Sequence, residues 1–219
     1  MNPALYSQLL ALAAGAVLVC ATLTLWRRSL GAIVTLLGAQ GAALGMVALV
    51  LGIHDGDASL IAVAVLVIAV KAALIPALIR RVVAADPDSR ETAPLVNVAT
   101  SLVVAGALTL LAYASTRPVV ALVPTAAGRL IPLGFAVVLI GFFLLASRRK
   151  AVSQVVGLLL VDNGIALVAF LGTAGVPLVV ELGASLDVLL GVVVLRVLAA
   201  ELRSRFGPID PDQLQELHD

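Results

Sequence analysis

Charged and aromatic side chains are scarce in this sequence. Asp, Glu, Lys and Arg make up only 12% of the 219 residues, and Phe, Trp and Tyr make up 4%, whereas 62% of the residues are hydrophobic. A soluble globular domain carries roughly 25% charged and about 45–50% apolar residues. The composition therefore predicts an integral membrane protein. No basic stretch with interleaved aromatic residues is present, so we expect no nucleic-acid partner.

Motifs for metals, nucleotides and redox centres are also missing. The single cysteine, Cys20, lies within an apolar run, which excludes an internal disulfide and a thiolate metal site. The sequence has no phosphate-binding glycine loop and no cluster of Cys and His, and we expect His54 and His218 to be solvated. We therefore expect no metal, no cofactor and no catalytic residue in this chain, which alone should not transfer electrons.

Long apolar runs dominate what is present. A helix needs about 20 predominantly apolar residues to cross a bilayer. Backbone groups in lipid must be satisfied internally, which favours helices. The start, MNPALYSQLL, lacks the basic residues of a cleavable signal, so we expect the first span to begin near residue 3. The sequence predicts an all-α membrane protein with about seven spans, at 3–26, 29–53, 59–83, 95–115, 130–147, 151–171 and 176–200.

The spans divide the chain into two halves. We expect a four-helix half over residues 1–115, an external connector over 116–129, a three-helix half over 130–205 and a cytoplasmic tail over 206–219. The connector segment PVVALVPTAAG could lie at the membrane interface or re-enter the membrane. Pro76 is expected to kink the third span, because proline cannot donate the backbone hydrogen bond of a helix interior.

The loop charges predict the orientation. Under the seven-span count, ten basic residues fall on one side of the membrane and two, Arg117 and Arg129, on the other. Cytoplasmic loops are enriched in Lys and Arg. We therefore expect the N-terminus outside and the C-terminus in the cytoplasm. The ten are Arg27, Arg28, Arg80, Arg81, Arg90, Arg148, Arg149, Lys150, Arg203 and Arg205.

Several polar residues fall near the middle of these spans. They are Gln40, Lys71, Asp162 with the adjacent Asn163, and Asp187; Glu181 lies nearer the outer side of the seventh span. A charge at a helix centre costs about 2.5–3.5 kcal/mol on insertion scales, so such residues face the bundle interior and mark ion paths or buried pairs. A site shared by Lys71 and an acid would keep both groups charged, whereas separated groups could exchange protons. Both a proton relay and a static ion pair agree with the pattern.

Spacing adds two expectations about these residues. Gly183, Asp187 and Gly191 are four positions apart and share one helix face, so Asp187 is expected to point into a protein contact. The segment TLLGAQGAAL in the second span can be laid on LLLVDNGIAL in the sixth, which pairs Gln40-Gly41 with Asn163-Gly164. The two halves could therefore be a duplication, or could resemble each other through apolar composition alone.

The C-terminal part carries a family resemblance. The segments RRKAVSQVVG, VDNG and PLVVELGASLDVL, together with VKAALIPALIRRV and PLVNV, closely resemble the component E subunits of hydrogenase-4 and related membrane-bound [NiFe] hydrogenases. The last three spans are more distantly similar to the K subunit of complex I and the C subunit of Mrp-type antiporters. In the K subunit two membrane glutamates serve proton translocation. By this resemblance Asp187 takes the position of one; the other falls at Leu159, where this chain has no acid, and Asp162 lies one turn further on.

The resemblance implies a multi-pass subunit of the inner (plasma) membrane, placed among antiporter-like subunits and hydrogenase or complex I-like subunits. Proton or sodium movement would then be coupled to electron transfer in partner chains, which would hold the NiFe centre and the iron–sulfur clusters. Lys71, Asp162, Asp187 and Glu181 would be the relay or buried charges, with Asn163 and Gln40 in support. Three alternatives remain open: a subunit of an Mrp-type cation/proton antiporter assembly, a purely structural membrane anchor, and a stand-alone transporter.

Overall fold

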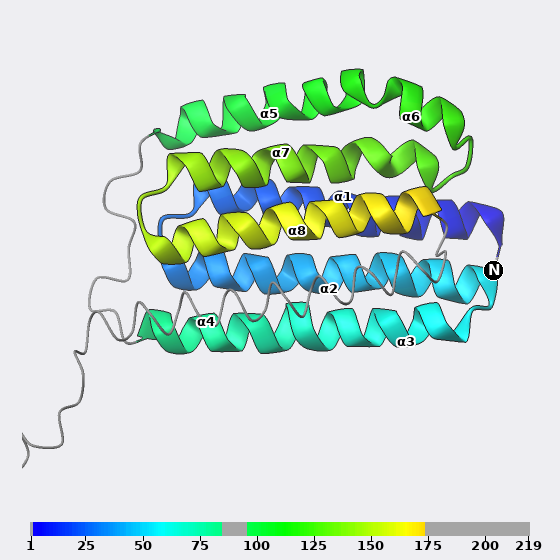
Figure 1. Cartoon of the computed structure of the whole chain (residues 1–219), viewed down its shortest axis with the longest axis horizontal. Coiled ribbons are helices and arrows are strands. Elements are labelled where there is room, and N and C mark those ends of the chain that lie inside the picture. The colour runs from blue at the N-terminus through cyan, green and yellow to red at the C-terminus, as the bar shows by residue number, and fades with distance from the viewer. Residues whose placement is uncertain (1, 85–95, 174–219) are drawn as a thin grey trace, which may run out of the picture.

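Helices account for every element of secondary structure in the part of the chain that the structure describes. The computed structural model describes residues 2–84 and 96–173 (Figure 1). Six helices there are long and apolar enough to cross a membrane, at Pro3–Trp26, Leu30–Asp55, Ala58–Arg81, Val98–Ser115, Gly128–Ser147 and Ala151–Thr173. These correspond to the first six predicted spans and confirm the all-helical membrane class. The predicted seventh span, 176–200, lies outside the described residues.

The elements follow in a simple order along the chain. The first two spans are α1 (Pro3–Trp26) and α2 (Leu30–Asp55), and the third is built from α3 (Ala58–Val67), η1 (Ile68–Leu74) and α4 (Ile75–Ala84) without a break. After residue 96 come α5 (Val98–Ser115), the short α6 (Arg117–Leu122), one 3-10 turn η2 (Gly128–Leu130), α7 (Ile131–Ser147) and α8 (Ala151–Thr173).

Side-chain caps explain where the helices begin. Asn2, Ser29, Asp57 and Asn97 each accept a hydrogen bond from a backbone N–H in the first turn of the helix that follows. These caps satisfy N–H groups that have no partner within the helix. Gly56 ends α2 with φ 69°, a conformation that glycine adopts without strain. Short turns between capped helices make α1, α2 and α3 antiparallel neighbours.

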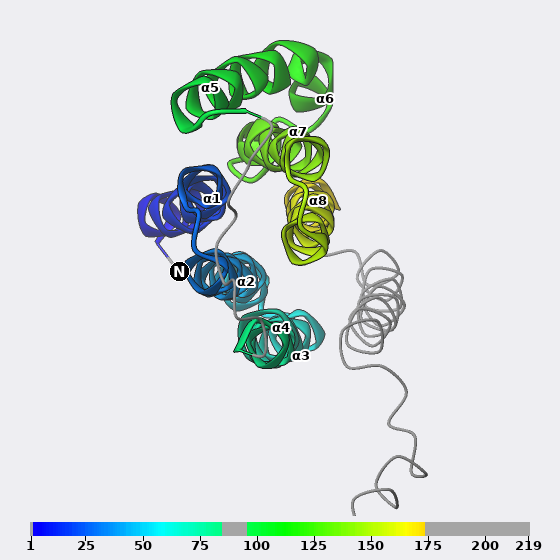
Figure 2. The ribbon, with the colours of Figure 1, turned by 90° about the vertical axis from the view of Figure 1, so that its left-hand side faces the viewer.

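The helices pack around α2. It contacts α1, α3, η1, α4 and α8, while α7 packs against α8, α1 and α5. Seen along the bundle, α2 lies between α1, α8 and the third span, and α5 lies at the outer edge beyond α7 (Figure 2). The second and sixth spans are thus the most enclosed, and both carry mid-span polar residues.

The third span contains a π-helix just ahead of Pro76. The seven residues before Ile75, Ile68–Leu74, form this π-helix, and the helix then runs on through Pro76. The wider π turn accommodates the missing N–H of Pro76 within a continuous helix. The carbonyl of Ala72, four residues before Pro76, lies against Gly38 of α2, where an added Cβ would approach it to 3.1 Å.

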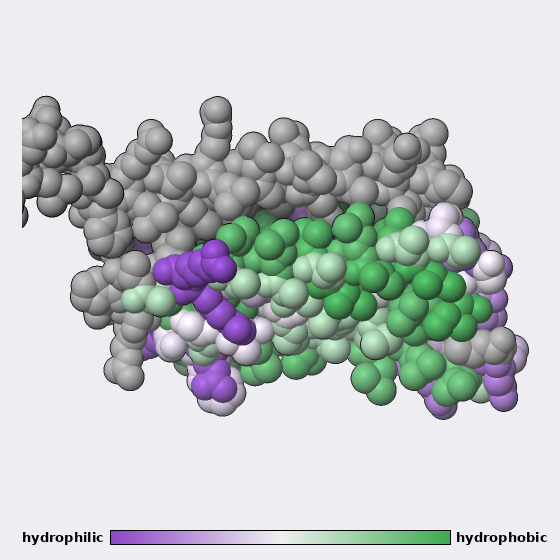
Figure 3. Space-filling view, turned by 90° about the horizontal axis from the view of Figure 1, so that it is seen from below, coloured by the Kyte–Doolittle hydropathy of each residue, from purple (hydrophilic) through white to green (hydrophobic). Residues whose placement is uncertain are grey.

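Charged residues gather at the ends of the bundle. Apolar side chains cover most of the length between hydrophilic ends (Figure 3). Among the described residues, the end of the bundle where α1 finishes and α8 begins carries seven basic residues, whereas the opposite end carries Arg117 and Arg129. The connector lies at this opposite end, where α6 precedes α7 (Figure 1). The seven are Arg27, Arg28, Arg80, Arg81, Arg148, Arg149 and Lys150.

Candidate functional site

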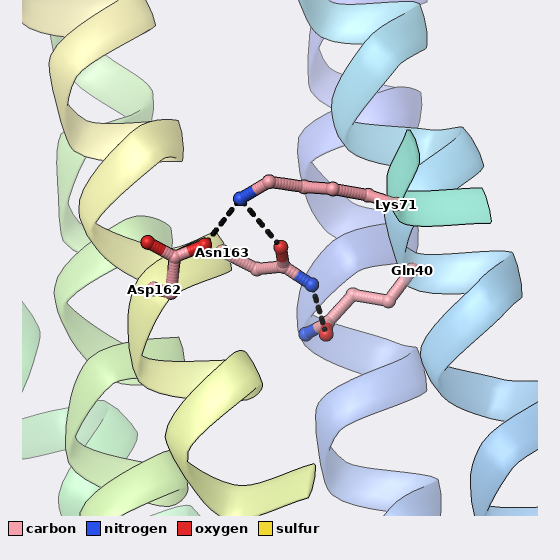
Figure 4. A network of polar contacts seen from close by, with 4 residues as sticks. All are labelled: Gln40, Lys71, Asp162 and Asn163. Carbon is pink, nitrogen blue, oxygen red and sulfur yellow. Dashed lines mark hydrogen bonds and ion pairs between the residues drawn. The ribbon is translucent and has the colours of Figure 1, made fainter. Parts of the chain in front are cut away.

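Four of the polar residues singled out from the sequence meet in the middle of the bundle. Gln40 comes from α2, Lys71 from η1, and Asp162 and Asn163 from α8 (Figure 4). Their exposed fractions are 0%, 5%, 8% and 3% in that order. Asp187 and Glu181 lie outside the described residues, so their positions relative to this site stay predictions.

Lys71 and Asp162 form a direct ion pair. The Lys71 ammonium donates to the Asp162 carboxylate at Oδ2, and it also donates to Asn163 Oδ1 at 3.1 Å. A buried charge that loses its partner costs several kcal/mol, so the pair is what allows these two groups to stay inside an apolar bundle. The prediction left a shared and a separated arrangement open; the structure has the shared one.

A chain of amides continues from the ion pair to α1. Asn163 Nδ2 donates to Gln40 Oε1 at 2.9 Å, and Gln40 Nε2 donates to the backbone carbonyl of Val17 at 3.2 Å. The carbonyl at one end can only accept and the ammonium at the other end can only donate. These two ends fix the orientation of both amides, because reversing either one would set donor against donor or acceptor against acceptor. The site therefore links four helical segments through one directed set of hydrogen bonds.

Glycines next to the polar residues bring the helices close enough for these contacts. A Cβ added to Gly41 would lie 2.6 Å from the carbonyl carbon and oxygen of Lys71, so α2 and η1 touch through their backbones. A Cβ added to Gly164 would lie 2.7 Å from the backbone nitrogen of Val138 on α7. Small residues permit such approaches between membrane helices. The same arrangement therefore occurs in both pairs that the possible repeat aligns, Gln40-Gly41 and Asn163-Gly164. In each pair the polar residue points into the site and the glycine packs on a neighbouring helix.

Lys71 also lies at the centre of the π-helix Ile68–Leu74. One-turn π segments occur frequently at functional sites, because the extra residue re-aims side chains relative to a regular α-helix. In this segment, Lys71 is buried, and its backbone is held against Gly41. In the sequence, Pro76 indicates irregular backbone nearby, but it does not indicate that the irregularity is a π-helix.

Among the described residues, one buried charged residue was missed by sequence reasoning. Arg148, counted among the loop charges, is only 5% exposed, and its Nη2 donates to the carbonyls of Leu25 at 2.9 Å and Arg27 at 3.4 Å. These carbonyls lie at the C-terminal end of α1, where the helix dipole favours a cation. Arg148 therefore ties the α7–α8 turn to α1. No sequence signal separates it from its exposed neighbours.

The chemistry of the site is that of charge and hydrogen bonding. Among residues 2–84 and 96–173 no group of three or more His, Cys, Asp or Glu side chains is placed to hold a metal ion. His54, expected to be solvated, is exposed and stacks on Tyr6 at the end of the bundle where α1 begins, with ring centroids 3.9 Å apart. The central site can hold a proton or a small cation between a carboxylate, an amide oxygen and an amine.

Comparison with known proteins gives one informative match. The chain is 51% identical over 220 residues to a protein of Mycobacterium tuberculosis (strain ATCC 25618 / H37Rv) described as uncharacterized protein Rv0085, and the match covers 100% of both chains. No family model matches the chain, and no solved structure matches it.

Proposed function

The chain belongs to the same family as the mycobacterial protein Rv0085, and from this starting point we propose that it is a membrane subunit of a hydrogenase-4/complex I-like respiratory complex. In this role its buried charged residues contribute to the translocation of protons, or of sodium ions, coupled to electron transfer in partner subunits. The observation that carries the proposal is the directed polar chain from Asp162 to the Val17 carbonyl, inside a bundle whose buried side chains are mostly apolar.

The free-energy cost of burying these hydrogen-bonded polar groups in a membrane supports a functional role for them. Intramembrane ionisable residues are expensive, and they usually mark ion pathways or proton relays. Lys71, Asp162, Asn163 and Gln40 come from three separate spans and meet at one depth. A membrane anchor does not require ionisable groups, because close van der Waals packing and hydrogen bonds between neutral side chains can hold helices together in lipid.

The finer topology belongs to the same proposal. We place seven spans in the chain, with 176–200 as the last, the N-terminus outside and the C-terminus in the cytoplasm. The basic end of the bundle then faces the cytoplasm, as the excess of Lys and Arg in cytoplasmic loops requires. In a bacterial cell this membrane is the inner (plasma) membrane. Asp187 and Glu181 then enter the relay from the seventh span.

The partners follow from the resemblance of the C-terminal part. Antiporter-like membrane subunits flank this chain, and hydrogenase or complex I-like subunits carry the NiFe centre and the iron–sulfur clusters. Purification of the tagged chain in mild detergent, followed by mass spectrometry, tests this assignment. Recovery of antiporter-like chains with [NiFe] and iron–sulfur subunits supports it; antiporter-like chains alone indicate an Mrp-type assembly, and a chain without partners refutes it.

The relay itself is tested by substitution at two acids. In inverted vesicles, Asp162→Asn and Asp187→Asn are each expected to abolish proton or sodium movement coupled to electron transfer, while the complex still assembles. Ser7→Ala, at a partly exposed position near the start of α1 and far from the central site in the sequence of that helix, serves as a control with normal coupling. An assembled Asp162→Asn complex that pumps at the normal rate rules out Asp162 as a relay residue.

A static anchor is the second candidate, and one observation favours it. Lys71 and Asp162 are paired directly, which is also how a purely structural buried ion pair is built. In that case Asp162→Asn lowers the stability of the chain but leaves coupling intact in whatever complex assembles. The vesicle measurement therefore separates the two functions.

A further inference from the structure

The Lys71 ammonium is held in the way that proteins hold a small monovalent cation. Its partners among the described residues are a carboxylate oxygen, Asp162 Oδ2, and an amide oxygen, Asn163 Oδ1. Hard cations without strong geometric demands bind to oxygen ligands of these two kinds. Within residues 2–84 and 96–173, the carboxylate that pairs with this ammonium is that of Asp162.

The amide oxygen is fixed in place before any cation arrives. Asn163 Nδ2 is engaged by Gln40 Oε1, and Gln40 is in turn anchored on the Val17 carbonyl, so Asn163 Oδ1 must point toward Lys71. Ligand groups that already have the required orientation bind an ion without the free-energy cost of reorienting. The Val17 carbonyl fixes this orientation through Gln40, so it would persist if the ammonium were absent.

We propose that these oxygens form a binding site for a monovalent alkali cation, Na⁺ or K⁺. The tethered ammonium of Lys71 occupies this site in the structure, and the ammonium and the cation compete for it. The inference rests on the proposed function in ion translocation, whose substrate it narrows to a cation that exchanges with Lys71. When the ion enters, an N–H bond of the ammonium breaks, the electron pair stays on the nitrogen, and the proton leaves to water. One positive charge enters as one leaves, so the charge of the buried site is conserved.

Burial and charge define which ions fit. Among the described residues one carboxylate contributes to the site, and its single negative charge matches that of a monovalent ion. Asp162 is only 8% exposed and Asn163 only 3%, so an ion must lose most of its hydration shell to enter. Mg²⁺ sheds water reluctantly, and this also favours a monovalent ion.

Two substitutions of Lys71 separate ion binding from other effects. Lys71→Ala removes the ammonium and vacates the space of four side-chain atoms, which leaves room for an ion and a water molecule. Lys71→Met removes the charge but fills most of that space with an apolar chain. The double variant Lys71→Ala with Asp162→Asn keeps the space and removes the carboxylate.

The experiment measures the thermal unfolding of the purified full-length chain in mild detergent, in KCl, NaCl or choline chloride at equal concentration. For Lys71→Ala we expect a Tm at least about 4 °C higher in KCl or NaCl than in choline chloride, since ligands that bind only the folded state stabilise it. For Lys71→Met and for the double variant we expect the same Tm in all three salts.

Three outcomes overturn the inference. The first is a Lys71→Ala chain that does not respond to the choice of cation, and the second is an equal response in Lys71→Met, which indicates a general salt effect. The third is a Lys71→Ala chain that does not fold in KCl, because there the ion should replace the missing charge. If any of these occurs while Asp162→Asn still stops coupled ion movement in vesicles, the cation site is refuted and the proposed function stands. A cation response without an effect of Asp162→Asn on coupling refutes the function instead.

Discussion

Gly41→Ala is expected to disturb the site through the backbone contact between α2 and Lys71, without removing a polar group. The new Cβ would lie 2.6 Å from the carbonyl carbon and oxygen of Lys71 and 2.9 Å from the nitrogen of Ala72. Ordinary contact begins at 3.4 Å, so α2 and η1 must separate by roughly 0.8 Å. All of these atoms belong to the backbone, and no side-chain rotation can relieve the overlap. The separation draws Lys71 away from Asp162 and Asn163.

The magnitude follows from two opposing effects. Overpacking costs about 1–3 kcal/mol, and replacing glycine by alanine within a helix returns about 0.5–1 kcal/mol. We expect a net loss of about 1–2 kcal/mol in the free energy of unfolding, or a Tm lower by roughly 2–8 °C for a chain of this size. Thermal unfolding in mild detergent, followed by circular dichroism, measures this change.

Matched controls exist in the same chain. A Cβ added to Gly15 of α1 or to Gly106 of α5 meets nothing within 4 Å. Gly15→Ala and Gly106→Ala gain the helix propensity without the overlap, so their Tm is expected to equal or exceed that of the unchanged chain. If Gly41→Ala proves as stable as these two variants, the backbone contact between α2 and η1 does not exist as described, and the reasoning fails.

Other substitutions test the remaining parts of the site and the helix ends. Lys71→Met and Asp162→Leu, measured singly by thermal unfolding, should each lower the free energy of unfolding by about 3–5 kcal/mol, because each removes one partner of a buried ion pair. The double variant should cost only about 1–3 kcal/mol, for the amide oxygen that loses its donor, and additive losses would contradict the ion pair. Gln40→Leu should cost about 1–3 kcal/mol, since it leaves buried amide donors unpaired; an unchanged Tm would refute the amide chain. At the start of α3, hydrogen bonds from the Ser59 hydroxyl and from nearby backbone amides lower the pKa of Asp57. A lowered pKa gives stability that is present above the unfolded-state pKa and lost as the pH falls through the folded-state value, below about pH 4. Asp57→Ala should remove this acid sensitivity from the Tm profile, and a profile that keeps it would point to other carboxylates.

Much of the fold followed from hydropathy. A run of about 20 apolar residues has few options in lipid other than a helix, so the six described spans matched prediction to within a few residues. The predicted first residues of several helices differ from the observed ones by a few positions. They are set by local caps such as Ser29 and Asn97, whose role depends on a hydrogen bond that composition does not reveal.

The sequence singled out the four described residues that meet in the site, but it did not show how they pair. Depth along a span can be counted from the sequence, and it placed Lys71 and Asp162 near the same level. The direction in which each side chain points around its helix depends on how the helices are rotated and packed, and here two residues 91 positions apart face one another. The π-helix before Pro76 shifts that direction further by adding a residue to the turn. Periodicity counted at 3.6 residues per turn cannot anticipate this shift.

The part that α1 plays in the site has a consequence for how the family can be studied. The α1 helix has no charged residue, and its contribution to the central hydrogen-bond chain is the Val17 carbonyl, a group that every amino acid provides. Substitution of the Val17 side chain leaves that acceptor in place, so neither alanine scanning nor a comparison of related sequences can identify the position. A backbone ester, made by replacing Leu18 with its α-hydroxy acid, weakens the carbonyl of Val17 as an acceptor. The first helix can thus be essential to the site without contributing a polar side chain to it, and chemistry applied to the main chain would expose that dependence.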